Sequence, residues 1–474
     1  MKRSLSVSVR AEAGRKRRLL DLSLALFSLL LAPCVAMMFA GAASADSDAT
    51  KLLKLRSAEF KKDIIRLSDN VYTSVGYGVS TVSMIIGDDG VIIIDAGIDT
   101  VSGAEIRRDF REITDKPVRA VVITHGHPDH YGGLAAFVDS EDVQVWVRKG
   151  FQSESNFLYE GGIYQQRKRG ALQAGFLLTA EERINNGIAK PYWPSRGGAV
   201  FESTYSAKPT HFTTEKRTRL AVAGIDLDLV QVEGETDDHL YIWYPTERIL
   251  FAGDNFYKSW PNLYAIRGSA YRDVRKWAQA VDEMLQEGPS VVVAGHTRPV
   301  VGADAVTDTL TNYRDAIQFL FDKTVEGINK GLTPNQLVDY VVLPEKYQKL
   351  DYLRPYYGNP EWAVRSIFNG YLGWFDGNAT NLFPLSDPEE ARRIAKLAGG
   401  VSELHAQSVQ ALEERDYQWV LHLCDYLLAL EPDSREAKLR KADAMTALAD
   451  EVLTATARNY YLGRAKQLRA SVAE

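Results

Sequence analysis

The residue types with the clearest chemical meaning lie in the stretch 124–133, which reads Thr-His-Gly-His-Pro-Asp-His-Tyr-Gly-Gly. Metal-binding side chains fill most of six consecutive positions there: His125, His127, Asp129 and His130. Neutral imidazole and carboxylate groups are the ligands that Zn²⁺ or a similar divalent ion takes from a protein. Single histidines usually have a structural role, but a cluster at this spacing is not easily explained in that way. The stretch therefore predicts a metal site.

The elements that must position these ligands are short apolar runs, which are typical of buried strands. One such run, 118–123, ends directly before the histidine cluster. Similar runs end just before Glu235, Asp254 and His296. Loops that follow strands can bring such side chains into one small volume, and seven ligands are more than one zinc ion needs. The residues therefore predict two metal ions per chain.

These motifs resemble those of the metallo-β-lactamase superfamily of binuclear metal hydrolases. Within it, the chain resembles the bacterial alkylsulfatases, which release sulfate from alkyl sulfate esters. At 234–236 it has Gly-Glu-Thr where the superfamily usually has Gly-His-Thr, and the alkylsulfatases likewise use a glutamate there. The segment Asn-Leu-Tyr-Ala-Ile-Arg-Gly at 262–268 resembles the family segment that grips the sulfate group. The segments 294–299 and 371–378 also look like family signatures.

The resemblance runs from about residue 68 to about residue 462 and is weakest between 150 and 208, where a substrate pocket could differ. It implies an α+β fold, in which an αββα metallo-β-lactamase sandwich is followed by an all-α helical dimerisation domain. A chain of 474 residues is long enough for more than one domain. Helical periodicity takes over past about residue 308. We therefore expect a catalytic domain at 46–308 and a helical domain at 309–474.

The resemblance also implies a role for each ligand. One zinc ion would be held by His125, His127 and Glu235, and the other by Asp129, His130 and His296, with Asp254 as the bridge. Asp129 is in addition a candidate catalytic residue. Two cations that share a water lower its pKa from about 16 toward neutrality, so that hydroxide becomes available. Nitrogen and oxygen ligands leave manganese or iron open as alternatives to zinc.

A sulfate monoester repels an anionic nucleophile, so positive charge is needed at the sulfate group. Arg267 offers a planar fork for two sulfate oxygens and Asn262 an amide donor, which makes both of them candidate catalytic and substrate-binding residues. Arg272 is a further candidate for substrate binding, although the sequence favours a surface salt bridge for it. His239 starts a strand-like run and suits a supporting role better than a ligand role. Asp95 is either a support for the metal loop or a solvated turn residue.

The net charge of −6 gives no electrostatic signature of nucleic-acid binding, so we expect no nucleic-acid partner. The expected partners are a small sulfate ester and, through the helical domain, a second copy of the chain. A helical cap without a partner is the alternative for that domain.

The N-terminus has the pattern of an export signal. Basic residues between positions 2 and 18 precede an uncharged stretch at 22–45 that ends in Ala-Ser-Ala, a small-x-small cleavage pattern. We therefore expect a signal at 1–45 and a periplasmic or secreted protein. The alternative is an uncleaved anchor, since the apolar run is nearly long enough to span a bilayer, and only then would the chain contact a membrane.

The sequence thus predicts an exported binuclear zinc hydrolase that cleaves sulfate monoesters, with alkyl sulfates as the expected substrates. Another metallo-β-lactamase-fold hydrolase, for lactams, thioesters or phosphoesters, is one alternative. Glu235 and the pair Asn262 and Arg267 weigh against it. A non-catalytic protein that keeps the metal site as a scaffold is the other alternative, and the complete ligand set weighs against that one.

Overall fold

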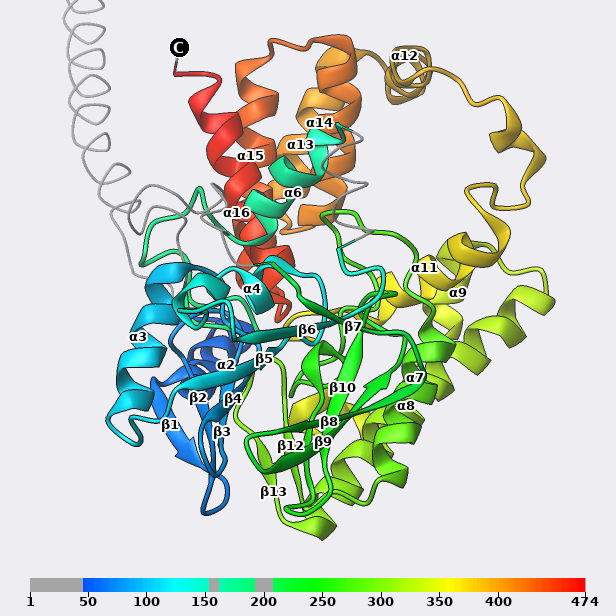
Figure 1. Cartoon of the computed structure of the whole chain (residues 1–474). Helices are drawn as coiled ribbons and strands as arrows, with labels where there is room; N and C mark the ends of the chain where they lie inside the picture. Colours follow the sequence, from blue (N-terminus) through cyan, green and yellow to red (C-terminus); the bar gives the residue numbers. More distant parts are fainter. Residues whose placement is uncertain (1–45, 153–161, 192–207, 474) are drawn as a thin grey trace, which may run out of the picture. The chain divides into compact units, whose positions relative to one another are not determined.

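The structure is a computed structural model that describes residues 46–152, 162–191 and 208–473 (Figure 1). From Asp48 onward, the described residues belong to one packed unit. The predicted export signal at 1–45 lies outside the described residues. None of the helices in the described ranges combines the length and the hydropathy that a bilayer crossing requires.

The first sheet follows the chain from β1 to β7 without a change of order. Its pairs are antiparallel up to β4 and parallel from β4 to β7. The central strand β4 is a run of four β-branched residues, all buried, as expected of a strand that is covered on both faces. The bounds are β1 (Asp63–Arg66), β2 (Val71–Val75), β3 (Val82–Ile86), β4 (Val91–Ile94), β5 (Val118–Val122), β6 (Gln144–Arg148) and β7 (His211–Thr213).

The second sheet has the order β13-β12-β11-β10-β9-β8. All of its neighbouring strands are antiparallel except the pair β11 and β12. The edge strand β8 has only one buried residue, Leu220, whereas β10 is buried throughout. The bounds are β8 (Arg217–Val222), β9 (Ile225–Gln231), β10 (Leu240–Tyr244), β11 (Ile249–Phe251), β12 (Val291–Val293) and β13 (Val300–Val301).

The two sheets lie face to face (Figure 1), and a core of mainly aliphatic side chains fills the space between them. Ile92 and Val122 of the first sheet and Leu229 and Ile242 of the second belong to it, and each of the four is fully buried. Burial of one such side chain stabilises the fold by about 1.5–3 kcal/mol. The inner faces therefore hold the sheets together and fix the ends of the strands on which the metal loops begin.

Helices cover the outer faces of both sheets, which completes the predicted αββα sandwich. Helix α3 (Thr100–Arg111) covers the first sheet through Ile106 and Phe110. Helices α7 (Val274–Gln286) and α8 (Ala303–Asn329) cover the second sheet, with Trp277 and Leu310 fully buried. Asp273 caps α7 by accepting from the N–H groups of the residues two and three positions on.

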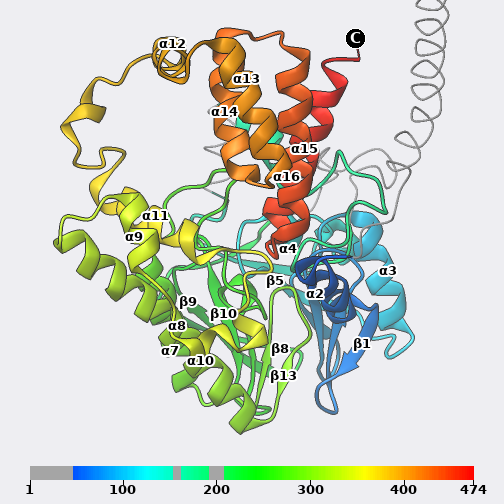
Figure 2. The same ribbon diagram turned by 180° about the vertical axis from the view of Figure 1, so that it is seen from behind.

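The described chain beyond α8 forms helices, as the sequence predicts (Figure 2). The division expected at 308/309 falls inside α8, and α8 packs on α7 and the second sheet, so we propose a division after α8 instead. Helices α13 to α16 form a bundle with its own core around Leu404, Leu423 and Leu427. The bounds are α9 (Pro334–Tyr340), α10 (Glu345–Gln348), α11 (Pro360–Leu372), α12 (Asp387–Ala398), α13 (Val401–Glu413), α14 (Tyr417–Leu430), α15 (Arg435–Glu451) and α16 (Ala455–Ala470).

Three further segments lie among or beside the helices beyond α8. Residues 373–386 connect α11 to α12 as an extended segment that stands away from the neighbouring helices, called the arm below (Figures 1 and 2). Helix α6 (Tyr164–Gln173) lies beside α16 and belongs to the region of weakest resemblance. Helix α2 (Asp48–Arg56) packs against α15.

Candidate metal centre

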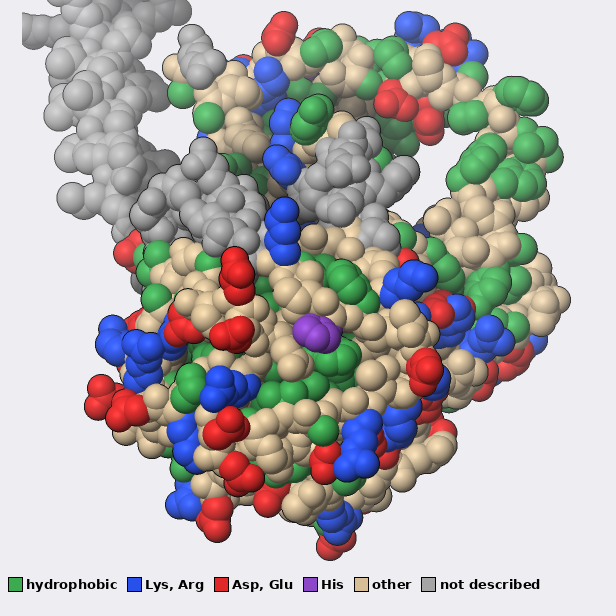
Figure 3. Space-filling view, in the orientation of Figure 1, with side chains coloured by type: hydrophobic (Ala, Val, Ile, Leu, Met, Phe, Trp, Pro, Cys, Tyr) green, Lys and Arg blue, Asp and Glu red, His purple; other side chains and the backbone are tan. Residues whose placement is uncertain are grey.

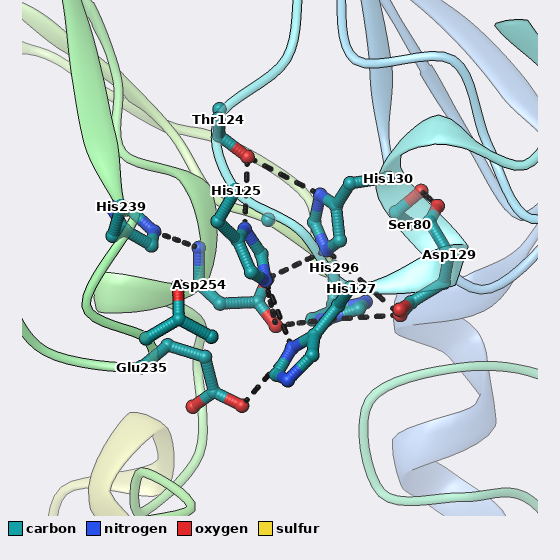
Figure 4. Close-up of polar contacts among 12 residues, drawn as sticks. Ser80, Thr124, His125, His127, Asp129, His130, Glu235, His239, Asp254 and His296 are labelled. Atoms are coloured by element: carbon teal, nitrogen blue, oxygen red, sulfur yellow. Dashed lines mark hydrogen bonds and ion pairs between the residues drawn. The ribbon is translucent and has the colours of Figure 1, made fainter. Parts of the chain in front are cut away.

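The predicted ligands lie together at one edge of the sandwich (Figure 4). His125 and His127 lie in the loop after β5, and Asp129 and His130 belong to the short helix α4 (Pro128–Tyr131). Pro128 stands at the first position of α4, where its missing N–H costs no helical hydrogen bond. Glu235, Asp254 and His296 come from the loops after β9, β11 and β12. The structure therefore brings together ligands that are far apart in the sequence.

The donor atoms form two groups, each of which could hold an ion: His125, His127 and Asp254 in one, and Asp129, His130 and His296 in the other. Within each group the atoms lie within 4.8 Å of one another. Ligand atoms about 2.1 Å from a tetrahedral ion lie about 3.4 Å apart. His125 Nε2 lies 3.0 Å from His127 Nδ1, and His296 Nε2 lies 3.8 Å from Asp129 Oδ2. These separations suit a metal ion in each group.

Asp254 lies between the two groups, in the position expected of a bridging ligand. Its Oδ1 lies 3.1 Å from His130 Nε2, and its Oδ2 lies 2.8 Å from His296 Nε2 and 3.9 Å from His125 Nε2. Asp254 Oδ1 and His130 Nε2 are both buried, and among the described residues neither has a hydrogen-bond partner of good geometry. Two buried polar atoms that lie this close without a hydrogen bond fit a cation between them.

Glu235 lies at the edge of the first group. Its Oε1 is 3.5 Å from His127 Nδ1, while its Oε2 accepts a hydrogen bond of 2.6 Å from Arg272. Burial raises the pKa of Glu235 to about 7, although the positive charge of Arg272 lowers it. Glu235 Oε1 still faces the group of His125, His127 and Asp254. Glu235 therefore lies beside this group, whereas Asp254 belongs to it.

Burial and charge prepare the imidazoles for metal binding. Burial lowers the pKa of His125 and His127 well below the usual value, and for His127 the charges of Arg267 and Arg272 lower it further, which favours the neutral imidazole that a metal ion binds. Burial also opposes the charged form of His130 and His296, but the carboxylate of Asp254 outweighs it and raises their pKa. The same carboxylate charge that raises these pKa values would also attract a metal cation.

Neighbouring groups fix the orientation of the ligands. Asp95 accepts from the Thr124 N–H at 2.8 Å, and its other oxygen lies 2.8 Å from His130 Nδ1, which turns His130 Nε2 toward the centre. Asp95 is buried at the end of β4, so it supports the metal loop and is not a solvated turn residue. His239 has the expected supporting role: burial lowers its pKa to about 3, and its Nε2 accepts from the Asp254 N–H at 3.2 Å.

A cavity of about 320 Å³ opens over both groups. Ligands at its base include His127, Asp129 and His296. Apolar side chains make up much of its wall, and polar side chains are set among them. The wall residues are Val79, Ile98, Pro128, Gln166, Arg167, Gly170, Ala171, Gln173, Ala174, Phe176, Asn186, Ile188, Arg267, Tyr357 and Thr456. The cavity can therefore take an anionic head at the metals and an apolar tail along the wall.

The predicted substrate residues divide into one that lines the cavity and two that lie behind it. Arg267 lines the wall, with Nη2 3.4 Å from His127 Nε2. Asn262 and Arg272 are buried and do not line the cavity, so their contact with substrate stays a prediction. The surface salt bridge favoured for Arg272 is wrong, because Arg272 is only 4% exposed and pairs with the buried Glu235. Sequence spacing carries no signal of that burial.

Sequence reasoning missed the wall residues that come from distant parts of the chain. Gln173 belongs to α6, Tyr357 precedes α11, and Thr456 belongs to α16. The one available signal was the weak resemblance at 150–208, which contains α6. No motif pointed to Tyr357 or Thr456, since each lies far in sequence from the metal ligands.

The fold and the site together define a metallo-β-lactamase type of hydrolase. Residues 75–296 match the family model described as the metallo-beta-lactamase superfamily. Residues 333–471 match the model described as alkyl sulfatase dimerisation. This fold, with its clusters of histidine and aspartate, indicates a divalent metal ion in the centre.

Comparison with individual proteins shows which members of this superfamily the chain is similar to. A linear primary-alkylsulfatase from Pseudomonas sp. (strain ATCC 19151) is 32% identical over 82% of this chain and 74% of its own length. An (R)-specific secondary-alkylsulfatase from Pseudomonas sp. is 29% identical over 86% of this chain and 63% of its own length. The solved structure of the stereoselective inverting sec-alkylsulfatase Pisa1 from Pseudomonas sp. matches with a TM-score of 0.81 at 26% identity. That match covers 91% of this chain and 69% of the other.

The chain belongs to the alkylsulfatase family of the metallo-β-lactamase superfamily. Membership of this family makes it a sulfuric ester hydrolase.

Proposed function

We propose that this chain hydrolyses alkyl sulfates with two zinc ions, held by the groups that meet at Asp254. The observation that carries the proposal is the position of both groups at the base of one cavity whose wall combines Arg267 with apolar side chains. Two ions held there would make hydroxide available near neutral pH and place positive charge opposite the sulfate group. His125 and His127, with Glu235 beside them, are the proposed holders of one ion, and Asp129, His130 and His296 of the other.

Arg267 is the proposed anchor for the sulfate group. Its guanidinium reaches the cavity beside His127, and a guanidinium fork matches two oxygens of a tetrahedral anion. Asn262 lies behind it, and the Asn262 Nδ2 is buried without a hydrogen-bond partner among the described residues. That amide is the proposed second donor once substrate is bound.

Arg272 has a different proposed role, which is to position Glu235. Its Nη1 donates to Glu235 Oε2 at 2.6 Å and to the carbonyl of Asn262 at 2.5 Å. One guanidinium thus ties the first metal group to the segment that carries the sulfate anchor. Because both partners are buried, removal of the arginine would leave Glu235 as an unpaired buried charge.

A sulfate-release assay on dodecyl sulfate, together with metal analysis, tests the proposed function. We expect about two zinc ions per chain and sulfate release that stops on chelation and returns with zinc. Bound zinc with turnover of a phosphoester or thioester, but not of dodecyl sulfate, would contradict the proposed substrate. Bound zinc with no turnover of any ester would favour a scaffold role instead.

We also propose that the chain forms a homodimer through its helical region, and the arm supports this. Large apolar side chains on and beside the arm are exposed: Trp374 at 73%, Phe383 at 93% and Leu397 of α12 at 84%. Hydrophobic side chains gather there in the space-filling view (Figure 3). Such patches mark interaction surfaces, and this one lies within residues that match the alkyl sulfatase dimerisation model.

Light scattering after size-exclusion chromatography tests the dimer. The unmodified chain should elute as a dimer, and Trp374→Ser with Phe383→Ser should shift it to a monomer. Leu55→Ser is the matched control, because Leu55 is 71% exposed on α2, away from the arm. A monomer in the unmodified chain, or a dimer in the double variant, would contradict the role of the arm.

We further propose export to the periplasm or beyond, which rests on the sequence at 1–45 alone. Mass analysis of the protein from the exported fraction should find a chain that begins at Asp46. A full-length chain retained in the membrane would favour the anchor instead.

A further inference from the structure

The substrate cavity is walled in part by the C-terminal helix of the region that matches the dimerisation model. Thr456 on α16 lines the cavity, although it lies far along the chain from the metal ligands of the sandwich. The Thr456 hydroxyl donates to the carbonyl of Tyr357, another wall residue, at 2.9 Å. The N–H of Ala455 donates to the Tyr356 carbonyl at 2.9 Å. The start of α16 is therefore bound to one wall of the cavity.

The same helix also contacts a second part of the wall, which α6 provides. Asn459 Nδ2 donates to the backbone carbonyl of Gln173 at 3.3 Å, and Asn459 is only 1% exposed. One turn further on, Gly463 allows a close approach, because a Cβ there would lie 2.7 Å from Leu172 Cδ2. Lys466 pairs with Glu182, in the loop that follows α6, at 2.6 Å. Contacts along about two turns of α16, from Asn459 to Lys466, thus hold α6 and the segment after it.

Gln173 connects this wall to the proposed sulfate anchor. Its side-chain Oε1 accepts a hydrogen bond of 3.1 Å from the backbone N–H of Arg267. Gln173 is buried, so this bond is shielded from water. The contacts therefore run from Asn459 on α16 through Gln173 on α6 to the backbone of Arg267, with no step that passes through the metal groups.

We propose that Asn459 and Gln173 are positioning residues for Arg267, through which the C-terminal helix sets the geometry of the anion site. The inference rests on the proposed function, in which Arg267 binds the sulfate group. Asn459 does not line the cavity, so any effect of its substitution on anion binding must pass through Gln173 or the wall. Of these three residues, Arg267 is the one that contacts a proposed metal ligand, His127.

Kinetics on zinc-loaded enzyme with Asn459→Leu and Gln173→Met test the proposal. Asn459→Leu keeps the branched shape of the side chain and Gln173→Met keeps its length, and each change removes the side-chain amide. We expect KM for dodecyl sulfate, and the inhibition constant of inorganic sulfate, to rise about three- to tenfold, as the loss of one neutral hydrogen bond predicts. We expect kcat to stay within about twofold, and zinc content to stay unchanged, because the metal groups are not altered.

Tyr461→Leu is the matched control. Tyr461 lies on the same helix but packs into the core of the α13 to α16 bundle, so its change loosens the bundle without touching Gln173. We expect a lower melting temperature with unchanged KM and inhibition by sulfate. If the control raised both constants as Asn459→Leu does, or if neither test variant raised them, the proposal would be overturned.

Direct binding of inorganic sulfate separates this proposal from the proposed function. Calorimetry on the zinc-loaded protein measures the anion site even if no alkyl sulfate is turned over. Weaker sulfate binding in Asn459→Leu than in Tyr461→Leu supports the positioning role whatever the substrate is. Equal binding in both variants overturns it, even in an enzyme that cleaves dodecyl sulfate.

Discussion

At the scale of single residues, the geometry of the metal centre depends on the ligands and equally on the side chains that hydrogen-bond to them. Asp95 shows this best, since one carboxylate holds both the Thr124 N–H and the His130 ring. It does so with φ of 59°, a left-handed conformation that aspartate and asparagine adopt more easily than most residues. An asparagine can therefore replace Asp95 without a change of backbone conformation.

Asp95→Asn keeps the backbone conformation and one acceptor but turns an amide donor toward His130. We expect zinc affinity to fall about 10–100-fold, the usual effect of losing a ligand-orienting carboxylate. Titration against a chelator of known affinity measures it. Asp89→Asn is the control, because Asp89 makes only an exposed ion pair with Arg119. Unchanged affinity in Asp95→Asn would show that His130 needs no such support.

Arg267→Ala tests the sulfate anchor. We expect KM to rise by about tenfold or more with zinc content intact, because a charge-assisted bond to substrate is lost while the ligands stay in place. Steady-state kinetics with zinc analysis of the same sample gives both numbers. Arg298→Ala is the control, since Arg298 pairs with Asp63 on the surface. An unchanged response to substrate concentration would remove Arg267 from the site.

At the scale of elements, the ligands meet because the loops after β5, β9, β11 and β12 open at one edge of the sandwich. Close backbone packing holds the first of these loops. Gly132 directly follows α4, and a Cβ there would lie 2.0 Å from the carbonyl oxygen of Ile98. Two loops thus pack backbone to backbone beside Asp129 and His130.

Gly132→Ala should therefore push α4 away from its neighbour and weaken both stability and metal binding. Its φ is ordinary, so the effect is steric, and we expect a loss of about 1–3 kcal/mol in unfolding free energy. Denaturant unfolding of the zinc-free protein measures it. Gly78→Ala is the control, because its Cβ would meet Ile98 and Ser102 only at ordinary contact distances of 3.4 Å. Equal stability of both variants would contradict the packing argument.

The sequence was most informative where function depends on neighbours along the chain. The cluster at 125–130 and the strand before it could be predicted because a tight loop needs only local spacing and β-branched residues. Arg272 and Gln173 could not be assigned, because their roles depend on which distant groups they meet in the folded chain. The division predicted at 308/309 falls inside α8, since helical periodicity does not show which core a helix faces.

At the scale of the whole molecule, the metal centre should also stabilise the fold. The ligands come from both sheets, so ions bound to the folded state hold the two halves of the sandwich together. Free zinc at about 100 times its dissociation constant should add about 2.7 kcal/mol to stability. Removal by a chelator should lower the melting temperature in the unmodified chain but not in Asp254→Ala. Equal melting with and without zinc in the unmodified chain would contradict this coupling.

The pairing of two ions at Asp254 is the claim on which the proposed function depends. Anomalous X-ray diffraction from crystals of the zinc-loaded protein, recorded on both sides of the zinc edge, locates each ion directly. We predict two zinc peaks about 3.5–4 Å apart, one on each side of the Asp254 carboxylate. A single peak, or peaks that lie away from Asp254, would contradict the account.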